Sequence, residues 1–186
     1  MLRRRNARRR VSQLAPLVII VGPIASGKSS VAARVAERLL EAGRTSAVVD
    51  LDDVADCLVA PKRDWETQWR RARQVHDELV AAFRRSGVDH VIAHGSFLYV
   101  DEPSGVPDGV HDNTTLRVLL SVTYETALER AQGDPERGVS KDPSFLRWTH
   151  NQFAQRTGTL PPFQIAIDTD GESIENMADL VFRACL

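Results

Sequence analysis

The chain has 186 residues, of which 42% are hydrophobic and 26% charged, and its formal net charge is −1. This length and composition are typical of one globular domain with a sizeable core. No apolar run approaches the roughly 20 residues of a membrane-spanning helix, so we expect no membrane association. Its two cysteines, Cys57 and Cys185, lack metal-ligand spacing. We therefore expect a reduced, cytoplasmic protein.

The first segment of the chain is strongly basic. Residues 1–10 hold six arginines and no acid, so the rest of the chain carries a net charge of −7 against −1 for the whole. We expect residues 1–15 to form a disordered, solvated tail, although such a tail can also contact nucleic acid or an acidic membrane surface. The acidic body argues against a nucleic-acid-binding face, so nucleic acid is not an expected partner.

A strand, a glycine-containing loop and a helix follow the tail. Leu17–Val21 is an uninterrupted apolar run, typical of a parallel strand buried on both faces. The next eight residues, 22–29, fit G-x-x-x-x-G-K-[ST], the phosphate-binding P-loop. Val31, Val35 and Leu39 then mark one face of a helix that extends to residue 42. The motif therefore has the strand and the helix that it requires, and a chance match in a turn is the alternative.

A P-loop binds phosphate mainly through its backbone. Its N–H groups and the positive end of the helix dipole converge on the anion, and glycines permit the close approach. We expect the Lys28 ammonium to reach the β- and γ-phosphates and the Ser29 hydroxyl to bind Mg²⁺. The sequence thus predicts a site for ATP and Mg²⁺. Its nucleotide-binding residues are expected to be Gly22, Ile24, Ala25, Ser26, Gly27, Lys28, Ser29 and Ser30.

Strands and helices alternate through the rest of the chain. Further strands are predicted at residues 45–49, 88–93, 116–122 and 164–167, and further helices at residues 64–86, 124–132, 143–157 and 173–184. Residues 101–115, rich in proline, glycine and polar side chains, predict a loop. The alternation predicts an α/β protein with a five-stranded parallel sheet covered by helices on both faces. Ligands of such sheets bind beyond the carboxyl ends of the strands.

Three acids follow the second predicted strand. Residues two apart in an extended segment point to the same side, so Asp50 and Asp52 would face the site together. We expect Asp50 to hold Mg²⁺ and Asp52 to accept the proton of an attacking hydroxyl, although which acid is the base stays open. Asp53 would face away or cap the next helix. The alternative is that all three acids only stabilise a helix N-terminus.

These motifs resemble the small P-loop kinases of the nucleoside-monophosphate-kinase-like group, such as shikimate kinase, gluconate kinase and chloramphenicol phosphotransferase. The resemblance covers residues 16–186, and Asp50-Leu51-Asp52 matches the Asp-x-Asp of shikimate kinase. It implies a three-layer α/β/α P-loop NTPase fold with a helical substrate-binding segment at about residues 54–87 and a lid at about residues 133–147. The chain lacks the triple glycine and the Arg-Pro-Leu-Leu lid signature of shikimate kinase, which argues against shikimate as the acceptor.

Two arginines match the lid that the resemblance implies. In the related kinases, arginines at similar spacing bracket the lid, one near adenine and one reaching the transferring phosphate. Arg130 is therefore expected at the nucleotide and Arg137 at the transferring phosphate, where its charge would stabilise the transition state. Gly133 and Gly138 would act as hinges for a closure that excludes water. A solvated, arginine-rich loop is the alternative.

The acceptor site is marked less clearly. A polar turn after the third predicted strand resembles a glycine-containing turn of these kinases, and its residues His94, Gly95 and Ser96 are expected to contact the acceptor. Arg73, in the predicted helix 64–86, shares a face with Trp69 and His76. That face would either hold a ring-bearing or anionic acceptor or pack in the core.

Together these features predict an ATP-dependent phosphotransferase that moves the γ-phosphate of MgATP to a hydroxyl of a small-molecule acceptor, as a monomer or homodimer. Lys28, Asp52 and Arg137 are the expected catalytic residues, and Asp52 and Arg73 are expected to bind the acceptor. A nucleoside or nucleotide kinase and an antibiotic-inactivating phosphotransferase remain open as alternatives. A non-catalytic nucleotide sensor would not need the acids and the lid arginines together. A GTPase would normally show Asn-Lys-x-Asp, which is absent.

Overall fold

The computed structural model describes residues 14–59, 64–96, 114–158, 160 and 162–186. Residues 1–13 of the expected tail and residues 101–113 of the expected loop lie outside these ranges. Within them, five parallel strands form one sheet in the order β2-β3-β1-β4-β5. The strands are β1 (Leu17–Val21), β2 (Ser46–Asp50), β3 (His90–Gly95), β4 (Thr115–Ser121) and β5 (Ile165–Asp168).

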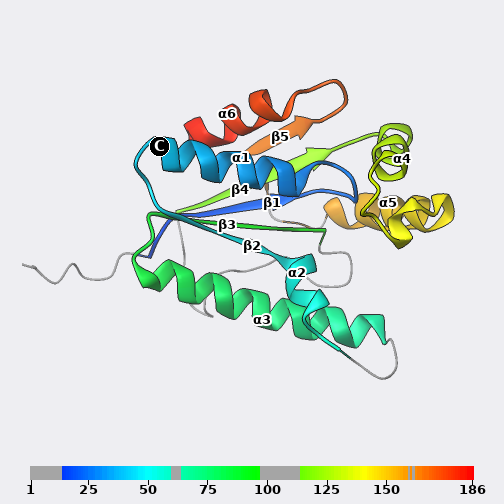
Figure 1. The fold of residues 1–186 in the computed structure, drawn as a ribbon, viewed down its shortest axis with the longest axis horizontal. Coiled ribbons are helices and arrows are strands. Elements are labelled where there is room, and N and C mark those ends of the chain that lie inside the picture. Colours follow the sequence, from blue (N-terminus) through cyan, green and yellow to red (C-terminus); the bar gives the residue numbers. More distant parts are fainter. Residues whose placement is uncertain (1–13, 60–63, 97–113, 159, 161) are drawn as a thin grey trace, which may run out of the picture.

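Helices cover both faces of the sheet. They are α1 (Lys28–Glu41), α2 (Leu51–Asp56), α3 (Trp65–Ser86), α4 (Tyr124–Gly133), α5 (Pro143–Thr157) and α6 (Ile174–Cys185), with a short 3-10 helix, η1 (Val139–Lys141), before α5. Figure 1 shows α1 and α6 on one face and α3 on the other, with α4 and α5 near the carboxyl ends of the strands. The predicted three-layer α/β/α fold with a five-stranded parallel sheet is confirmed.

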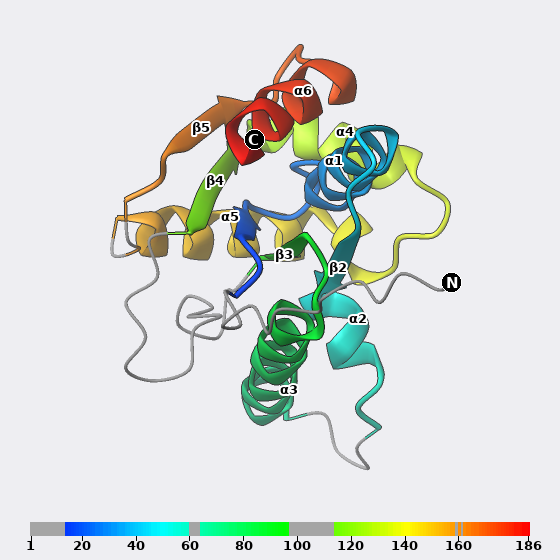
Figure 2. The same cartoon turned by 90° about the vertical axis from the view of Figure 1, so that its left-hand side faces the viewer.

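Two of the core clusters lie on opposite sides of β1, whose five side chains are all buried. Ile19 and its alternate neighbours join a cluster that includes residues of α2, α3 and α5. Val18 and Ile20 face the opposite way and join a cluster with α1 and α6. Because successive strand residues point to opposite faces, an uninterrupted apolar run fits only a strand with a helical layer on each side. Figure 2, turned by 90°, shows these layers from one end of the sheet.

The predicted elements lie within one or two residues of the observed ones, because apolar periodicity and end signals mark them. Val31, Val35 and Leu39 are fully buried on α1, as their spacing predicts. Helix α3 begins where the Asp64 side chain accepts a hydrogen bond from the Thr67 backbone and ends at Gly87, whose φ is 94°. No helix within the described ranges is both long and apolar enough to cross a membrane.

Helix α2 was not among the predicted helices, although a helix N-terminus at the three acids was the stated alternative, and it changes the geometry of the acids. The Asp50 carboxylate accepts a hydrogen bond from the Asp52 backbone N–H at 2.9 Å and so caps α2, which begins at Leu51. The expectation of an extended segment through Asp52 is therefore wrong, and so is its argument that the two carboxylates face one side. Of the two places expected for Asp53, the helix cap is wrong, because Asp50 takes that position and Asp53 lies in the first turn of α2.

Candidate active site

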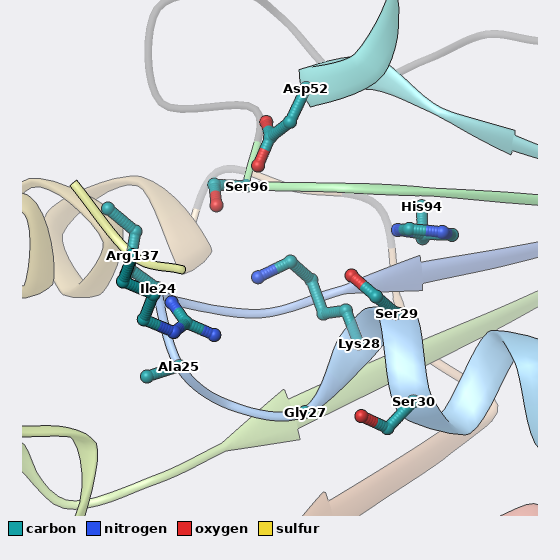
Figure 3. Close-up of a pocket in the computed structure, with 10 residues that line it drawn as sticks. All are labelled: Ile24, Ala25, Gly27, Lys28, Ser29, Ser30, Asp52, His94, Ser96 and Arg137. Carbon is teal, nitrogen blue, oxygen red and sulfur yellow. The ribbon is translucent and has the colours of Figure 1, made fainter. Parts of the chain in front are cut away.

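A pocket of about 90 Å³ lies at the carboxyl end of β1. Figure 3 shows four segments meeting there: the P-loop, the start of α2, the end of β3 and the segment between α4 and η1. The parallel sheet explains this convergence, because the carboxyl ends of β1, β2 and β3 lie at one edge. The lining residues are Ile24, Ala25, Gly27, Lys28, Ser29, Ser30, Asp52, His94, Ser96 and Arg137.

The P-loop backbone depends on glycine at its first position. A Cβ on Gly22 would lie 2.5 Å from the Ser26 Oγ and 2.8 Å from the Leu120 carbonyl oxygen, which is too close for any side chain. Gly27 precedes α1 with a φ of 88°, and Ala25 adopts a φ of 64° although it is not glycine. The left-handed conformation of Ala25 is sparsely populated by residues with a side chain, so its surroundings must hold it.

Lys28 presents a buried cation to the pocket. Only 8% of the residue is exposed, and its Nζ donates a hydrogen bond to the Pro23 carbonyl at 2.8 Å. Burial lowers the pKa of Lys28 to about 8, although the charges of Asp52 and Asp50 partly oppose this change. Removing an ammonium from water is costly unless a partner compensates. A bound polyanion would supply that compensation, so the pocket is suited to phosphate groups.

Asp52 and Asp50 occupy different environments. Asp52 is exposed at its outer side, but its carboxyl faces the pocket, where partial loss of water raises its pKa above the ordinary value. Asp50 does not line the pocket, and burial also raises the pKa of its carboxyl. The Asp50 Oδ1 lies 3.6 Å from the Nδ1 of His94, too far for a hydrogen bond. Burial lowers the pKa of His94 to about 4, so its ring is neutral at pH 7.

The two expected lid arginines differ in what they contact. Arg137 lines the pocket, and its Nε donates to the Asp134 carboxylate at 3.1 Å. Arg130 does not line it. Its guanidinium donates to the Thr169 carbonyl at 2.7 Å and to the Thr169 hydroxyl at 3.0 Å, and reaches the Ala25 carbonyl at 3.4 Å. Arg130 therefore ties the P-loop to the turn after β5.

The expected acceptor residues are only partly brought together. His94 and Ser96 line the pocket, whereas Gly95 ends β3 beside Val21 and does not. Arg73 does not line it either, and its Nε donates to the Asp77 carboxylate at 2.7 Å. Two neighbours of Arg73 pack in the protein interior: His76 is fully buried with its Nε2 3.3 Å from the Val49 carbonyl oxygen, and Trp69 packs against the core.

His150 contacts the P-loop from outside the pocket lining, and Tyr124 and Arg147 extend this line of contacts. The Nε2 of His150, on α5, lies 3.1 Å from the Ile24 carbonyl oxygen. The ring of Tyr124, the first residue of α4, meets the His150 ring edge to face at 6.1 Å between centroids. The Arg147 guanidinium lies 3.8 Å from the centre of the Tyr124 ring. No short motif marks them, because these contacts join segments far apart in the chain.

Comparison with known families extends this description. A family model described as an AAA domain matches residues 17–144, which contain the P-loop, α2 and the segment that carries Arg137. The chain belongs to this family. The match covers well over half of the chain, and none of the curated proteins is similar enough in sequence to count as a relative.

Solved structures of similar shape include three kinases. Shikimate kinase from Acinetobacter baumannii, in complex with shikimate, has a TM-score of 0.63 and 17% identity over 91% of this chain and 92% of that one. Shikimate kinase from Bacteroides thetaiotaomicron also reaches 0.63, with 16% identity over 91% and 97%. APS kinase from Mycobacterium tuberculosis, in complex with AMPPNP and APS, reaches 0.58 with 19% identity over 91% and 96%. The expected likeness to P-loop small-molecule kinases is confirmed at the level of the fold.

Proposed function

We propose that the protein is a P-loop kinase that transfers the γ-phosphate of MgATP to a hydroxyl group of a small-molecule acceptor. The observation that carries this proposal is the pocket itself, where the P-loop, the buried Lys28 ammonium, the Asp52 carboxylate and the Arg137 side chain meet. A site that only bound nucleotide would need the loop and the lysine. The additional carboxylate and arginine supply the groups that phosphoryl transfer to a hydroxyl requires.

The nucleotide phosphates would lie against the P-loop and the first turn of α1. The loop N–H groups, the helix dipole and Lys28 would bind the β- and γ-phosphates. Ser29 and Ser30 lie in the first turn of α1 and line the pocket, whereas Ser26 is buried in the preceding loop and remains a proposed contact through its backbone. Mg²⁺ would neutralise charge on these phosphates. Ser29 and Asp50 are the proposed oxygen donors for it, and this donor set fits a hard cation. Within the described ranges no group of three or more His, Cys, Asp and Glu side chains could hold a metal by itself, so phosphate oxygens and water would complete the shell.

Asp52 is the proposed general base. The acceptor hydroxyl oxygen would form a bond to the γ-phosphorus while its proton passes to the Asp52 carboxylate, and the bond between the γ-phosphorus and the bridging oxygen would break to leave ADP. The pocket partly removes the Asp52 carboxyl from water, which raises its pKa and makes the carboxylate a stronger base than an ordinary aspartate. Lys28 and Arg137 would stabilise the negative charge of the transferring group, and Arg130 would bind beside the nucleotide.

The acceptor would enter beside His94 and Ser96, which line the pocket next to Asp52. The neutral His94 ring and the Ser96 hydroxyl can form hydrogen bonds with a hydroxylated molecule. Gly95 and Arg73 remain proposed contacts of the acceptor, Arg73 within a proposed substrate-binding segment at residues 54–87. The two kinase complexes of similar fold carry different acceptors, shikimate and APS, so the fold does not select one.

The test is a screen for phosphate transfer. The wild-type protein, MgATP and panels of sugars, sugar acids, nucleosides, nucleotides and hydroxylated antibiotics would be incubated, with ADP release and the acceptor mass measured together. We expect ADP release that depends on one acceptor class and adds one phosphoryl group to it. Lys28→Ala should abolish this signal. MgATP binding without transfer to any member would favour a nucleotide sensor, and acceptor-independent hydrolysis would contradict the kinase proposal.

A further inference from the structure

Three backbone carbonyls of the P-loop contact nitrogen atoms of side chains, two of which lie outside the pocket lining. Lys28 Nζ bonds to the Pro23 oxygen, the His150 Nε2 lies 3.1 Å from the Ile24 oxygen, and Arg130 reaches the Ala25 oxygen at 3.4 Å. Three consecutive carbonyls are therefore held by side chains of α1, α5 and α4. A carbonyl oxygen only accepts hydrogen bonds, so the His150 ring must carry its hydrogen on Nε2 and donate it to Ile24.

This contact fixes the direction of a neighbouring N–H group. The Ile24 carbonyl and the Ala25 N–H belong to one peptide unit, and no described peptide bond is cis. In a trans peptide the C=O and N–H point in opposite directions. Holding the Ile24 oxygen towards α5 therefore turns the Ala25 N–H away from α5. Ile24 and Ala25 both line the pocket, so this N–H belongs to the wall that a phosphate would meet.

The conformation of Ala25 makes the Ile24–Ala25 peptide dependent on this hydrogen bond. Its φ of 64° is unfavourable for a residue with a Cβ, and a peptide flip would relieve it. Tyr124 fixes the ring that does the holding. Its ring packs edge to face with His150, and its hydroxyl donates to the Pro143 carbonyl at 3.0 Å. Arg147 lies over the Tyr124 ring, with its guanidinium carbon 3.8 Å from the ring centre.

We propose that His150 is a positioning residue for the nucleotide phosphates: through the Ile24 carbonyl it keeps the Ala25 N–H directed into the P-loop. This inference rests on the proposed phosphate site and assigns it a determinant on α5, more than a hundred residues from the loop. His150 itself does not line the pocket. Burial lowers the pKa of its ring, so the neutral tautomer with hydrogen on Nε2 performs this role at pH 7.

Three variants separate this role from general stability. His150→Phe keeps an aromatic ring against Tyr124 and removes the donor, whereas His150→Gln restores an N–H near the position of Nε2. His90→Phe is the matched control, because the His90 Nε2 also contacts a backbone carbonyl, that of Cys185 at 3.2 Å, where β3 begins. That contact is at the edge of the sheet opposite the P-loop, so the change should leave phosphate binding unaltered.

Binding would be measured by calorimetry with two probes, MgATP and inorganic triphosphate. The second probe reports the phosphate site without adenine. We expect His150→Phe to weaken both by roughly tenfold, the usual scale for one net hydrogen bond, and His150→Gln to recover most of the loss. In turnover with an acceptor, KM for ATP should rise while KM for the acceptor stays constant. His90→Phe should bind both probes as the wild type does.

The outcomes distinguish the inference from the proposed function. Wild-type protein that binds neither probe would overturn both. A folded His150→Phe protein that binds both probes as tightly as the wild type would overturn the inference alone, as would equal weakening in His90→Phe. Nitrogen-15 NMR of the wild-type histidine rings tests it without any variant: a His150 ring with its hydrogen on Nε2 is required, and hydrogen on Nδ1 alone would contradict it.

Discussion

Lys28 and Gly22 show how the P-loop motif determines local structure at the scale of single residues. The motif places a glycine at residue 22, where a Cβ would meet the Leu120 backbone. It also places a buried lysine at residue 28, the first residue of α1. These residues could be predicted because they are contiguous in the sequence. The outer contacts of the loop, from Arg130 and His150, could not, because each depends on packing between separate elements.

Lys28→Met should stabilise the free protein while abolishing nucleotide binding. The pKa of Lys28 falls to about 8 on folding, so at pH 7 the folded state holds a buried charge that the unfolded state exposes to water. We expect the free energy of unfolding to increase by about 1–3 kcal/mol at pH 7, since each tenfold loss of proton affinity corresponds to roughly 1.4 kcal/mol. Between pH 8 and 10.5 the unfolded wild type binds more protons, so wild-type stability rises with pH and the gain shrinks. Urea unfolding of both proteins across this range measures it; a gain independent of pH would contradict the assignment of this cost to the buried ammonium.

Gly22→Ala should destabilise the fold because the new Cβ meets the backbone oxygen of Leu120 at 2.8 Å. We expect a loss of about 1–3 kcal/mol, as for other overpacked sites. Gly133→Ala is the matched control, since a Cβ there meets nothing within 4 Å. It should match the wild type or gain up to about 1 kcal/mol from its helical position. Equal unfolding midpoints for the two variants would show that the loop tolerates a side chain at residue 22.

At the scale of elements, the long helices and strands were predictable and α2 was not. Periodicity needs several turns to become visible, and α2 spans only six residues. Its cap uses the acids that the Asp-x-Asp pattern had placed on an extended segment. Asp52 lines the pocket, whereas one oxygen of Asp50 accepts a hydrogen bond from the Asp52 backbone.

Two substitutions separate the structural role of Asp50 from its proposed role in binding Mg²⁺. Asp50→Asn keeps an oxygen that can cap α2 and removes the charge, so stability should stay close to that of the wild type. Asp50→Ala removes the cap as well and should cost about 1 kcal/mol. Both should raise the Mg²⁺ concentration needed for half-maximal transfer. Unchanged Mg²⁺ dependence in both variants would leave Asp50 with the capping role alone.

At the scale of the whole molecule, the strand order explains why a few separate sequence motifs form one site. With β1 between β3 and β4, and β2 beside β3, the P-loop, α2 and the end of β3 meet at one edge. Alternating strands and helices predicted the parallel sheet, and the pocket lies at the carboxyl ends of its strands, where such sheets usually bind ligands. The α3 face that carries His76 could not be assigned from the sequence. Residues spaced three or four apart share a helix face whether that face lines a pocket or packs in the core, and in the structure His76 is in the core.

The central claim is that Asp52 and the P-loop act together in phosphoryl transfer to a hydroxyl. Its most direct test is the transfer of labelled γ-phosphate from MgATP to the best acceptor, compared between the wild type and Asp52→Asn, with MgATP affinity measured for both. We predict nearly unchanged affinity and transfer slower by about 10²-fold or more, the scale of losing a general base. Transfer at the wild-type rate in Asp52→Asn, or hydrolysis that needs no acceptor and survives the substitution, would contradict it.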